Sequence, residues 1–62
     1  MKVYKIGNAK NKIEDFYATF EDMVEFLKTK DHDALNYSLA NLKEMPAGAI
    51  ELVGNVRVTR RS

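Results

Sequence analysis

The chain has 62 residues, one histidine and a formal net charge of +1. It contains no cysteine, which excludes a disulfide framework and a thiolate metal site. This length allows one small domain, residues 1–62, and the hydrophobic content of 45% with 31% charged residues is typical of a globular chain. Its apolar runs are too short for a membrane span or a signal peptide, and the lack of cysteine fits the cytoplasm.

The charges form three blocks along the chain. Residues 1–13 carry four lysines and no acid, residues 14–33 carry seven acids against two lysines, and residues 34–62 carry four basic residues against two acids. If the two ends form a sheet and the middle forms a helix outside it, the folded domain has a basic side and an acidic side. Such a field orients partners and steers association more than it adds affinity.

Two strands are predicted at the start of the chain. Residues 2–6 are rich in β-branched and aromatic residues and precede a turn-forming Gly-Asn pair. Residues 12–18 predict a second strand, with Phe16 and Ala18 on one face and Tyr17 on the other. The short polar loop between the two strands favours an antiparallel hairpin.

A helix is predicted over residues 20–29, directly after Thr19. Thr19 is a candidate N-cap, because Asp22 stands three residues later, where a capping box has Glu or Gln. Apolar residues recur at helical spacing at positions 20, 23, 24 and 27. Glu21, Asp22 and Glu25 lie on the outer face, and the first two complement the helix dipole.

A second helix is predicted over residues 34–45. Leucines at positions 35, 39 and 42 form its apolar stripe, which Tyr37, Ala40 and Met45 widen. Asp31 or Asp33 caps its start, and the Pro-Ala-Gly run at 46–48 ends it. The alternative is one bent helix over 20–45, against which the polar run Asp-His-Asp at 31–33 argues.

The last apolar segment, residues 49–59, allows more than one arrangement. A single strand bent at Gly54 places Ile50, Leu52 and the valines at 56 and 58 on one face, and we favour it. A three-residue loop over 53–55 ranks second. A hairpin with a two-residue Gly-Asn turn would put Ile50 and Leu52 on the opposite face from these valines. The expected fold is therefore α+β, in the order β-β-α-α-β, with an antiparallel sheet covered on one face by helices.

No arrangement of side chains predicts catalysis. The run Asp-His-Asp at 31–33 cannot converge on one metal ion or substrate, and Ser38 lies two helical turns from His32. The adjacent carboxylates Glu14 and Asp15 point to opposite sheet faces, and the glycines are too scattered for a phosphate-binding loop. We therefore expect no enzyme, no cofactor and no metal site.

The basic tail contains candidate binding residues. On a strand, Arg57 points away from the core beside Thr59, Arg60 lies at a frayed end, and Arg61 follows. Arginine on a rigid element suits carboxylate or phosphate recognition. Alternatively, these charges protect an edge strand against aggregation.

Three segments resemble small bacteriophage host-takeover proteins, most closely the RNA polymerase inhibitors of T7-like phages. They are residues 16–27, with an aromatic-Tyr-Ala strand end before a Thr-capped acidic helix, then Pro-Ala-Gly at 46–48 and Val-Thr-Arg at 58–60. A second helical segment before Pro-Ala-Gly and a longer last strand depart from the family pattern. The resemblance implies that arginines of the last strand and acids of the helix contact the polymerase. Arg60 corresponds to a family arginine through the Val-Thr-Arg motif, and Arg57 is the other candidate because of the strand face on which it is expected.

The leading hypothesis is a non-enzymatic protein-binding module, a phage-encoded inhibitor of a host protein or complex such as RNA polymerase, acting in the host cytoplasm. Its expected partner-binding residues are Arg57, Arg60, Arg61, Glu21, Asp22 and Glu25. One alternative is a small nucleic-acid-binding protein using the basic ends, against which the small net charge and the acidic helix argue. Another is a homo-oligomeric structural protein. No membrane partner is expected.

Overall fold

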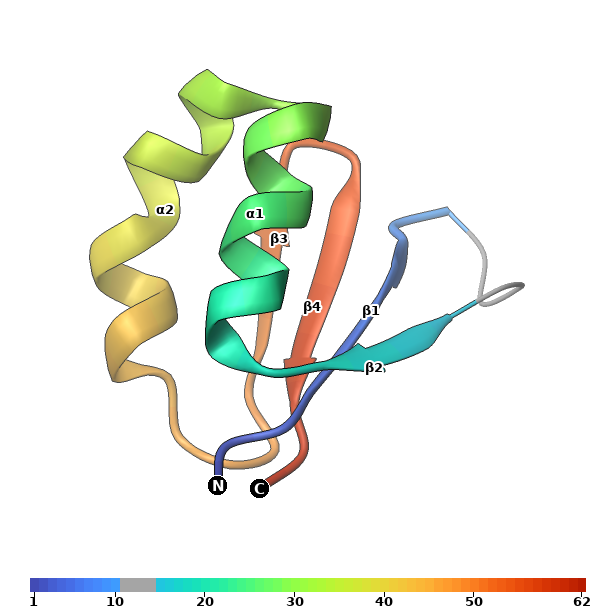
Figure 1. The fold of residues 1–62 in the computed structure, drawn as a ribbon, viewed down its shortest axis with the longest axis vertical. Helices are drawn as coiled ribbons and strands as arrows, with labels where there is room; N and C mark the ends of the chain where they lie inside the picture. The colour runs from blue at the N-terminus through green and yellow to red at the C-terminus, as the bar shows by residue number, and fades with distance from the viewer. Residues whose placement is uncertain (11–14) are drawn as a thin grey trace.

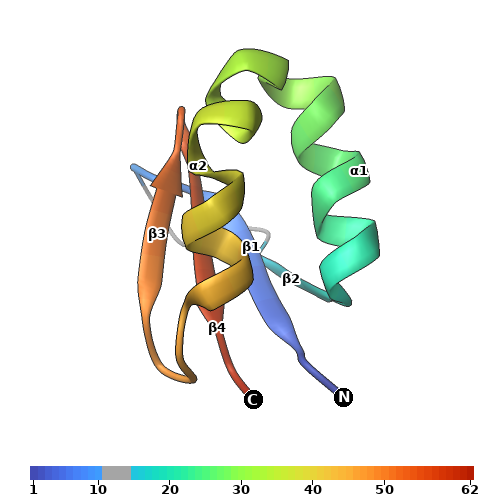
Figure 2. The same ribbon diagram turned by 90° about the vertical axis from the view of Figure 1, so that its left-hand side faces the viewer.

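The computed structural model describes residues 1–10 and 15–62 (Figure 1). In these residues the elements are β1 (Tyr4–Asn8), β2 (Phe16–Ala18), α1 (Phe20–Lys30), α2 (His32–Glu44), β3 (Ile50–Val53) and β4 (Val56–Arg60). The strands form one antiparallel sheet in the order β2-β1-β4-β3. Figures 1 and 2 show both helices on the same side of this sheet. The predicted α+β class is confirmed.

The first hairpin has the predicted faces. Phe16 and Ala18 of β2 pair with inward-facing residues of β1, whereas Tyr17 pairs with Lys5 and faces away from the helices. The predicted strand over 12–18 is described from Asp15 onward, so its residues 12–14 lie outside the described part. β1 ends later than predicted, because the Gly-Asn pair at 7–8 does not turn but pairs with β4.

Helix α1 begins where the capping pattern places it. The Thr19 side chain accepts a hydrogen bond from the Asp22 backbone N–H at 3.2 Å, which satisfies one of the free donors at the helix start. Met23 and Leu27 are buried against the sheet, as the apolar spacing predicts. Asp31 ends α1 by donating its N–H to the Leu27 carbonyl at 2.8 Å.

Asp31 is also the N-cap of α2, so two separate helices meet at this residue. The alternative of one bent helix over 20–45 is wrong. Oδ1 of the Asp31 carboxylate accepts from the Ala34 N–H at 3.1 Å, which selects Asp31 rather than Asp33 as the N-cap. Leu35 and Leu42 are buried as predicted. Tyr37 is 89% exposed, so the expectation that it widens the apolar stripe is wrong.

A tight turn at 46–49 brings the chain from α2 into the sheet. Ala49 donates its N–H to the Pro46 carbonyl, and Gly48 has φ +90°, a left-handed conformation that glycine adopts without strain. Gly48 N–H donates to the Arg60 carbonyl while Arg60 N–H donates to the Ala49 carbonyl. Gly48 and Ala49 thus lie opposite the single residue Arg60, which is a β-bulge with glycine at its first position.

The chain over 49–59 forms a hairpin, so the single-strand prediction is wrong. β3 and β4 pair from Ile50 with Thr59 to Val53 with Val56, and Gly54 turns between them at φ +60°. Val53, Val56 and Val58 face the helices. Ile50 and Leu52 face away from the helices and are 61% and 60% exposed. This is the hairpin with a two-residue Gly-Asn turn, which was not favoured because it separates Ile50 and Leu52 from the valines.

The core lies between the helix pair and the inner sheet face. It contains Tyr4 and Ile6 from β1, Val53, Val56 and Val58 from the second hairpin, Met23 and Leu27 from α1, and Leu35, Leu42 and Met45 from α2 and its end. The chain ends meet beside it, since Arg61 N–H donates to the Val3 carbonyl at 2.7 Å (Figure 1). A domain of this size buries a smaller share of its surface than a larger domain does, so these ten side chains make up most of a thin core.

Replacing Val58 by alanine should lower the free energy of unfolding by about 1–3 kcal/mol, because it removes buried methyl groups from a thin core. Leu52→Ala is the matched control and should change it by less than about 0.5 kcal/mol, since Leu52 faces solvent. Urea unfolding measures both. Equal losses in the two variants would mean that Leu52 is packed inward and that the hairpin register is wrong.

Candidate functional site

The side of the sheet that the helices leave uncovered, here called the outer sheet face, carries a regular array of side chains. One row crosses all four strands, from Ile50 through Thr59 and Lys5 to Tyr17. The adjacent row contains Leu52, Arg57 and Gly7. Side chains at alternate positions of antiparallel strands share a face, so the register alone brings these residues together.

Large apolar side chains occupy both edges of the outer sheet face. Tyr17 on β2 is 62% exposed, and Ile50 and Leu52 on β3 are equally open to solvent. Elsewhere in the described residues, the other exposed large hydrophobic residues are Met1, Phe16 and Tyr37, which do not share a face with one another. The outer sheet face is therefore the described surface on which exposed apolar side chains gather.

A nearly buried ion pair lies at the centre of this face. The carboxylate of Asp15 contacts the guanidinium of Arg57, and these side chains are only 6% and 13% exposed. Arg57 also donates to the Asn8 carbonyl at 2.6 Å, and the Lys5 ammonium lies 3.9 Å from the same Asp15 oxygen. Oδ1 of Asp15 accepts no hydrogen bond from the residues that the structure describes. The pair links β4 to the segment that enters β2.

The ion pair crosses β1 above Gly7, and only glycine leaves room for it. A Cβ added at Gly7 would overlap the Asp15 carboxylate and would lie 2.9 Å from the Arg57 guanidinium. β1 is therefore the strand over which the two charged side chains meet, and a side chain at position 7 would separate them. Glycine inside a strand often marks such a close approach.

The structure gives the three predicted arginines different surroundings. Arg57 is on the outer sheet face as expected, but it is largely buried in its ion pair. Arg60 is the last residue of β4, but it is not frayed: it pairs with Tyr4 of β1, and its guanidinium donates to the Met45 carbonyl at 2.7 Å and the Ser62 carbonyl at 3.1 Å. Arg61 follows β4 and is exposed.

The predicted acids lie on the other layer of the molecule. Glu21, Asp22 and Glu25 are exposed on α1, and Glu25 pairs with Lys28 at 3.5 Å. The helices cover the inner sheet face, so these acids and the outer sheet face cannot contact one flat partner surface together. Sequence analysis missed Ile50 and Leu52 as surface residues, although the Gly-Asn pair at 54–55 is itself a hairpin indication.

The histidine and carboxylate side chains of the described residues do not form a metal-binding cluster. No group of three His, Cys, Asp or Glu side chains among residues 1–10 and 15–62 could hold a metal ion. Within the Asp-His-Asp run, Asp31 caps α2, and the exposed His32 ring lies 3.4 Å from the Asn36 amide. Glu14, the other half of the adjacent carboxylate pair, lies outside the described residues.

No protein-family model, curated protein or solved structure matches this chain. Neither α1 nor α2 has the length and apolar character that crossing a membrane requires.

Arg57→Ala should lower the free energy of unfolding by about 3 kcal/mol, because it leaves the Asp15 carboxylate buried without its nearest cation. Arg61→Ala removes an exposed arginine four residues later and should change it by less than about 0.5 kcal/mol. Urea unfolding of both variants beside the parent chain tests this. A loss below about 0.5 kcal/mol for Arg57→Ala would show that the ion pair is not structural.

Proposed function

We propose that this protein is a small, non-enzymatic protein-binding module that docks on a larger partner through its outer sheet face. The observation that carries the proposal is the exposure of Tyr17, Ile50 and Leu52, each about three-fifths open to solvent, on one uncovered face. Exposed apolar side chains gathered on one surface of a soluble domain mark interaction sites. A chain this short has few large apolar side chains to spare from its core.

The chemistry of the outer sheet face suits a protein partner. Interfaces combine apolar and aromatic side chains with arginine, and the outer sheet face places Leu52 directly across from Arg57. The ion pair fixes the Arg57 side chain before any partner arrives, so less conformational entropy is lost on docking. Lys5 adds a second cation beside the Asp15 carboxylate, so this cluster of described side chains has a net positive charge, which favours a partner with an acidic surface.

The nucleic-acid alternative has less support. Tyr4 is fully buried and Phe16 packs edge-on against Phe26, so among the described residues Tyr17 is the aromatic ring left on the outer sheet face for base stacking. Arg57 and Arg60 are both engaged in contacts inside the domain. Phosphate binding would have to use the remaining basic residues.

The resemblance to phage host-takeover proteins supplies a first partner to test. On that basis we propose that the module is phage-encoded, acts in the host cytoplasm and inhibits by occupying a surface of a bacterial protein or complex, with RNA polymerase as the first candidate. The acids Glu21, Asp22 and Glu25 of α1 and the exposed Arg61 are then secondary contacts, reachable only by a partner that extends around the domain.

A photo-crosslinking amino acid, p-benzoylphenylalanine, in place of Leu52 should give a discrete, light-dependent adduct with a larger protein when the full chain is produced in bacteria. The same amino acid in place of Tyr37, which is exposed on α2, is the matched control and should give no such adduct. Gel electrophoresis and mass spectrometry of the adduct identify the partner, and a subunit of RNA polymerase is the result that the resemblance implies.

An absence of any adduct from position 52, or equal adducts from positions 52 and 37, would contradict docking through the outer sheet face. An adduct of twice the mass of the chain would support the homo-oligomeric alternative instead.

A further inference from the structure

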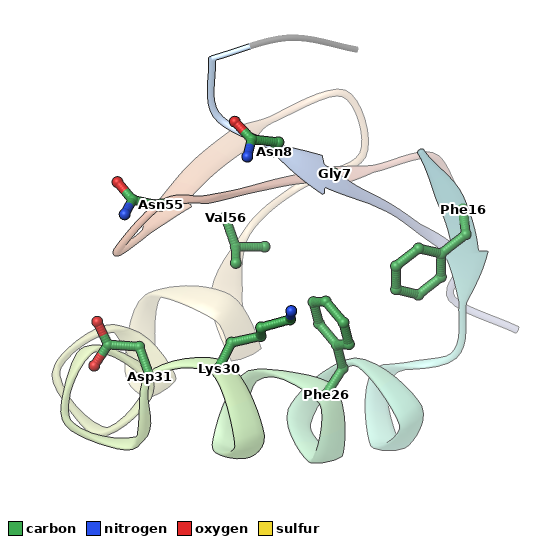
Figure 3. A pocket seen from close by; sticks show the side chains of 8 residues that line it. All are labelled: Gly7, Asn8, Phe16, Phe26, Lys30, Asp31, Asn55 and Val56. Carbon is green, nitrogen blue, oxygen red and sulfur yellow. The ribbon is translucent and has the colours of Figure 1, made fainter. Parts of the chain in front are cut away.

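The groove between the end of α1 and the sheet selects no ligand (Figure 3). Its lining includes the rings of Phe16 and Phe26 and two asparagines. It also contains the Lys30 ammonium and the Asp31 carboxylate, so opposite charges line the same space and favour neither an anion nor a cation. The free edge of β3 has a more definite chemistry, because backbone groups there determine what binds.

β3 is the last strand of the sheet, and its far edge pairs with no other strand of residues 1–10 and 15–62. Figure 2 is viewed toward this edge and shows α2 beside β3 rather than across it. The strand at the opposite edge, β2, is shorter, with three residues against four. An unpaired strand edge exposes N–H and C=O groups that can form a ladder with another extended chain.

Alternation along the hairpin determines which backbone groups face this free edge. Val53 closes the two-residue turn, where both backbone groups of a residue bond across the hairpin, and Glu51 repeats this position two residues earlier. The Ala49 carbonyl, two residues earlier again, accepts from the last residue of β4 at 3.0 Å. Ile50 and Leu52 lie between these positions, so their N–H and C=O groups are directed away from β4.

The side chains of the same two residues favour an apolar segment. Ile50 and Leu52 are about three-fifths exposed on the outer sheet face. Residues directly opposite each other in neighbouring strands share a face, so the residues of an added strand that pair with them also lie on the outer sheet face. Apolar side chains at those two positions would cover Ile50 and Leu52.

Glu51 determines the charge that an added strand should carry between its apolar residues. It lies opposite Val58, so its partly exposed side chain is on the helix side of the sheet edge. Among the described residues, no cation lies within ion-pair distance of its carboxylate. A lysine or arginine opposite Glu51 would be attracted to it, on the other face of the sheet from the cations Lys5 and Arg57.

The same carboxylate disfavours a second copy of the chain at this edge. In a two-fold antiparallel pairing that uses the outward groups of both strands, Ile50 of each copy pairs with Leu52 of the other. The two Glu51 carboxylates then lie directly opposite each other, and like charges in that position destabilise a strand pair. A charge that points inward on an edge strand is a common protection against self-association.

We infer that the free edge of β3 binds an extended segment of the partner as an antiparallel fifth strand of the sheet. The segment has apolar residues opposite Ile50 and Leu52 and a lysine or arginine opposite Glu51. Its backbone supplies affinity, and these alternate side chains supply selectivity. The inference rests on the proposed function, since it names the part of the protein partner that the β3 edge of the outer sheet face takes.

The experiment adds acetyl-Thr-Val-Lys-Val-Thr-amide to the isotopically labelled full chain and follows backbone amide hydrogen exchange by NMR. In the free chain, the amides of Ile50 and Leu52 should exchange faster than those of Glu51 and Val53, which bond to β4. At a peptide concentration of about twice its Kd, exchange at Ile50 and Leu52 should slow about threefold, since only the unbound fraction exchanges.

Two methylated peptides test the backbone ladder. Methylating the backbone nitrogen of either valine removes a donor that faces β3 and should weaken binding at least about threefold, the effect of one lost hydrogen bond. Methylating the backbone nitrogen of the lysine is the matched control, because that N–H faces away from β3, and should leave the affinity unchanged. Equal losses for the two positions would overturn the inference.

The charge preference is tested with acetyl-Thr-Val-Glu-Val-Thr-amide. The parent chain should bind it at least about threefold more weakly than the lysine peptide, the difference expected of one partly exposed ion pair. Glu51→Lys should reverse this preference. Glu44→Lys makes the same change of net charge at an exposed position of α2 and should leave the preference intact.

A lack of saturable slowing at Ile50 and Leu52, or a preference for the lysine peptide that survives Glu51→Lys, overturns the inference. Slowing that grows with protein concentration in the absence of peptide would show that a second copy occupies the edge, and overturns it as well. The titration uses no partner protein, so its failure leaves the crosslinking result at position 52 standing, with a partner that covers the outer sheet face without extending the sheet. The reverse also holds.

Discussion

The contact between Asp15 and Arg57 across β1 is the interaction on which the arrangement of the sheet depends. Asp15 leads into β2, a strand of only three residues at the edge of the sheet, and Arg57 belongs to β4 on the far side of β1. The ion pair thus holds the edge strand to the second hairpin without any direct pairing between β2 and β4. Both side chains are nearly buried, so each depends on the other to offset its loss of water.

Two features elsewhere in the chain make this contact possible. Gly7 leaves β1 without a side chain at the crossing point, and the register between β1 and β4 places Arg57 directly beside Gly7 on the outer sheet face. The two-residue turn after Val53 directs Ile50 and Leu52 to the same face, where Leu52 lies across from Arg57. The surface proposed to bind a partner is in this sense a consequence of the hairpin register.

The sequence allowed the helices to be predicted more accurately than the strands. Capping by Thr19 and the apolar spacing through Leu27 are local, so α1 was predicted to within one residue. The final strand was predicted wrongly, because the argument assumed that Ile50 and Leu52 must be buried with the valines. The pairing of Asp15 with Arg57 joins residues 42 positions apart, and no local pattern indicates it. The groove beside Lys30 likewise depends on how α1 packs, which periodicity does not determine.

The most direct test of this account is a double-mutant cycle between Gly7 and Asp15, measured by urea unfolding. In the parent chain, Gly7→Ala should lower the free energy of unfolding by about 1–3 kcal/mol, because the new methyl group overlaps the Asp15 carboxylate. In an Asp15→Ala background the overlap with the carboxylate is gone and only the end of the Arg57 side chain, 2.9 Å from the new methyl group, has to shift. The same change should then alter the free energy of unfolding by less than about 0.5 kcal/mol, since alanine is favoured over glycine within a strand. The same loss in both backgrounds would contradict the account, because Gly7 would then be required for a reason other than the ion pair that crosses it.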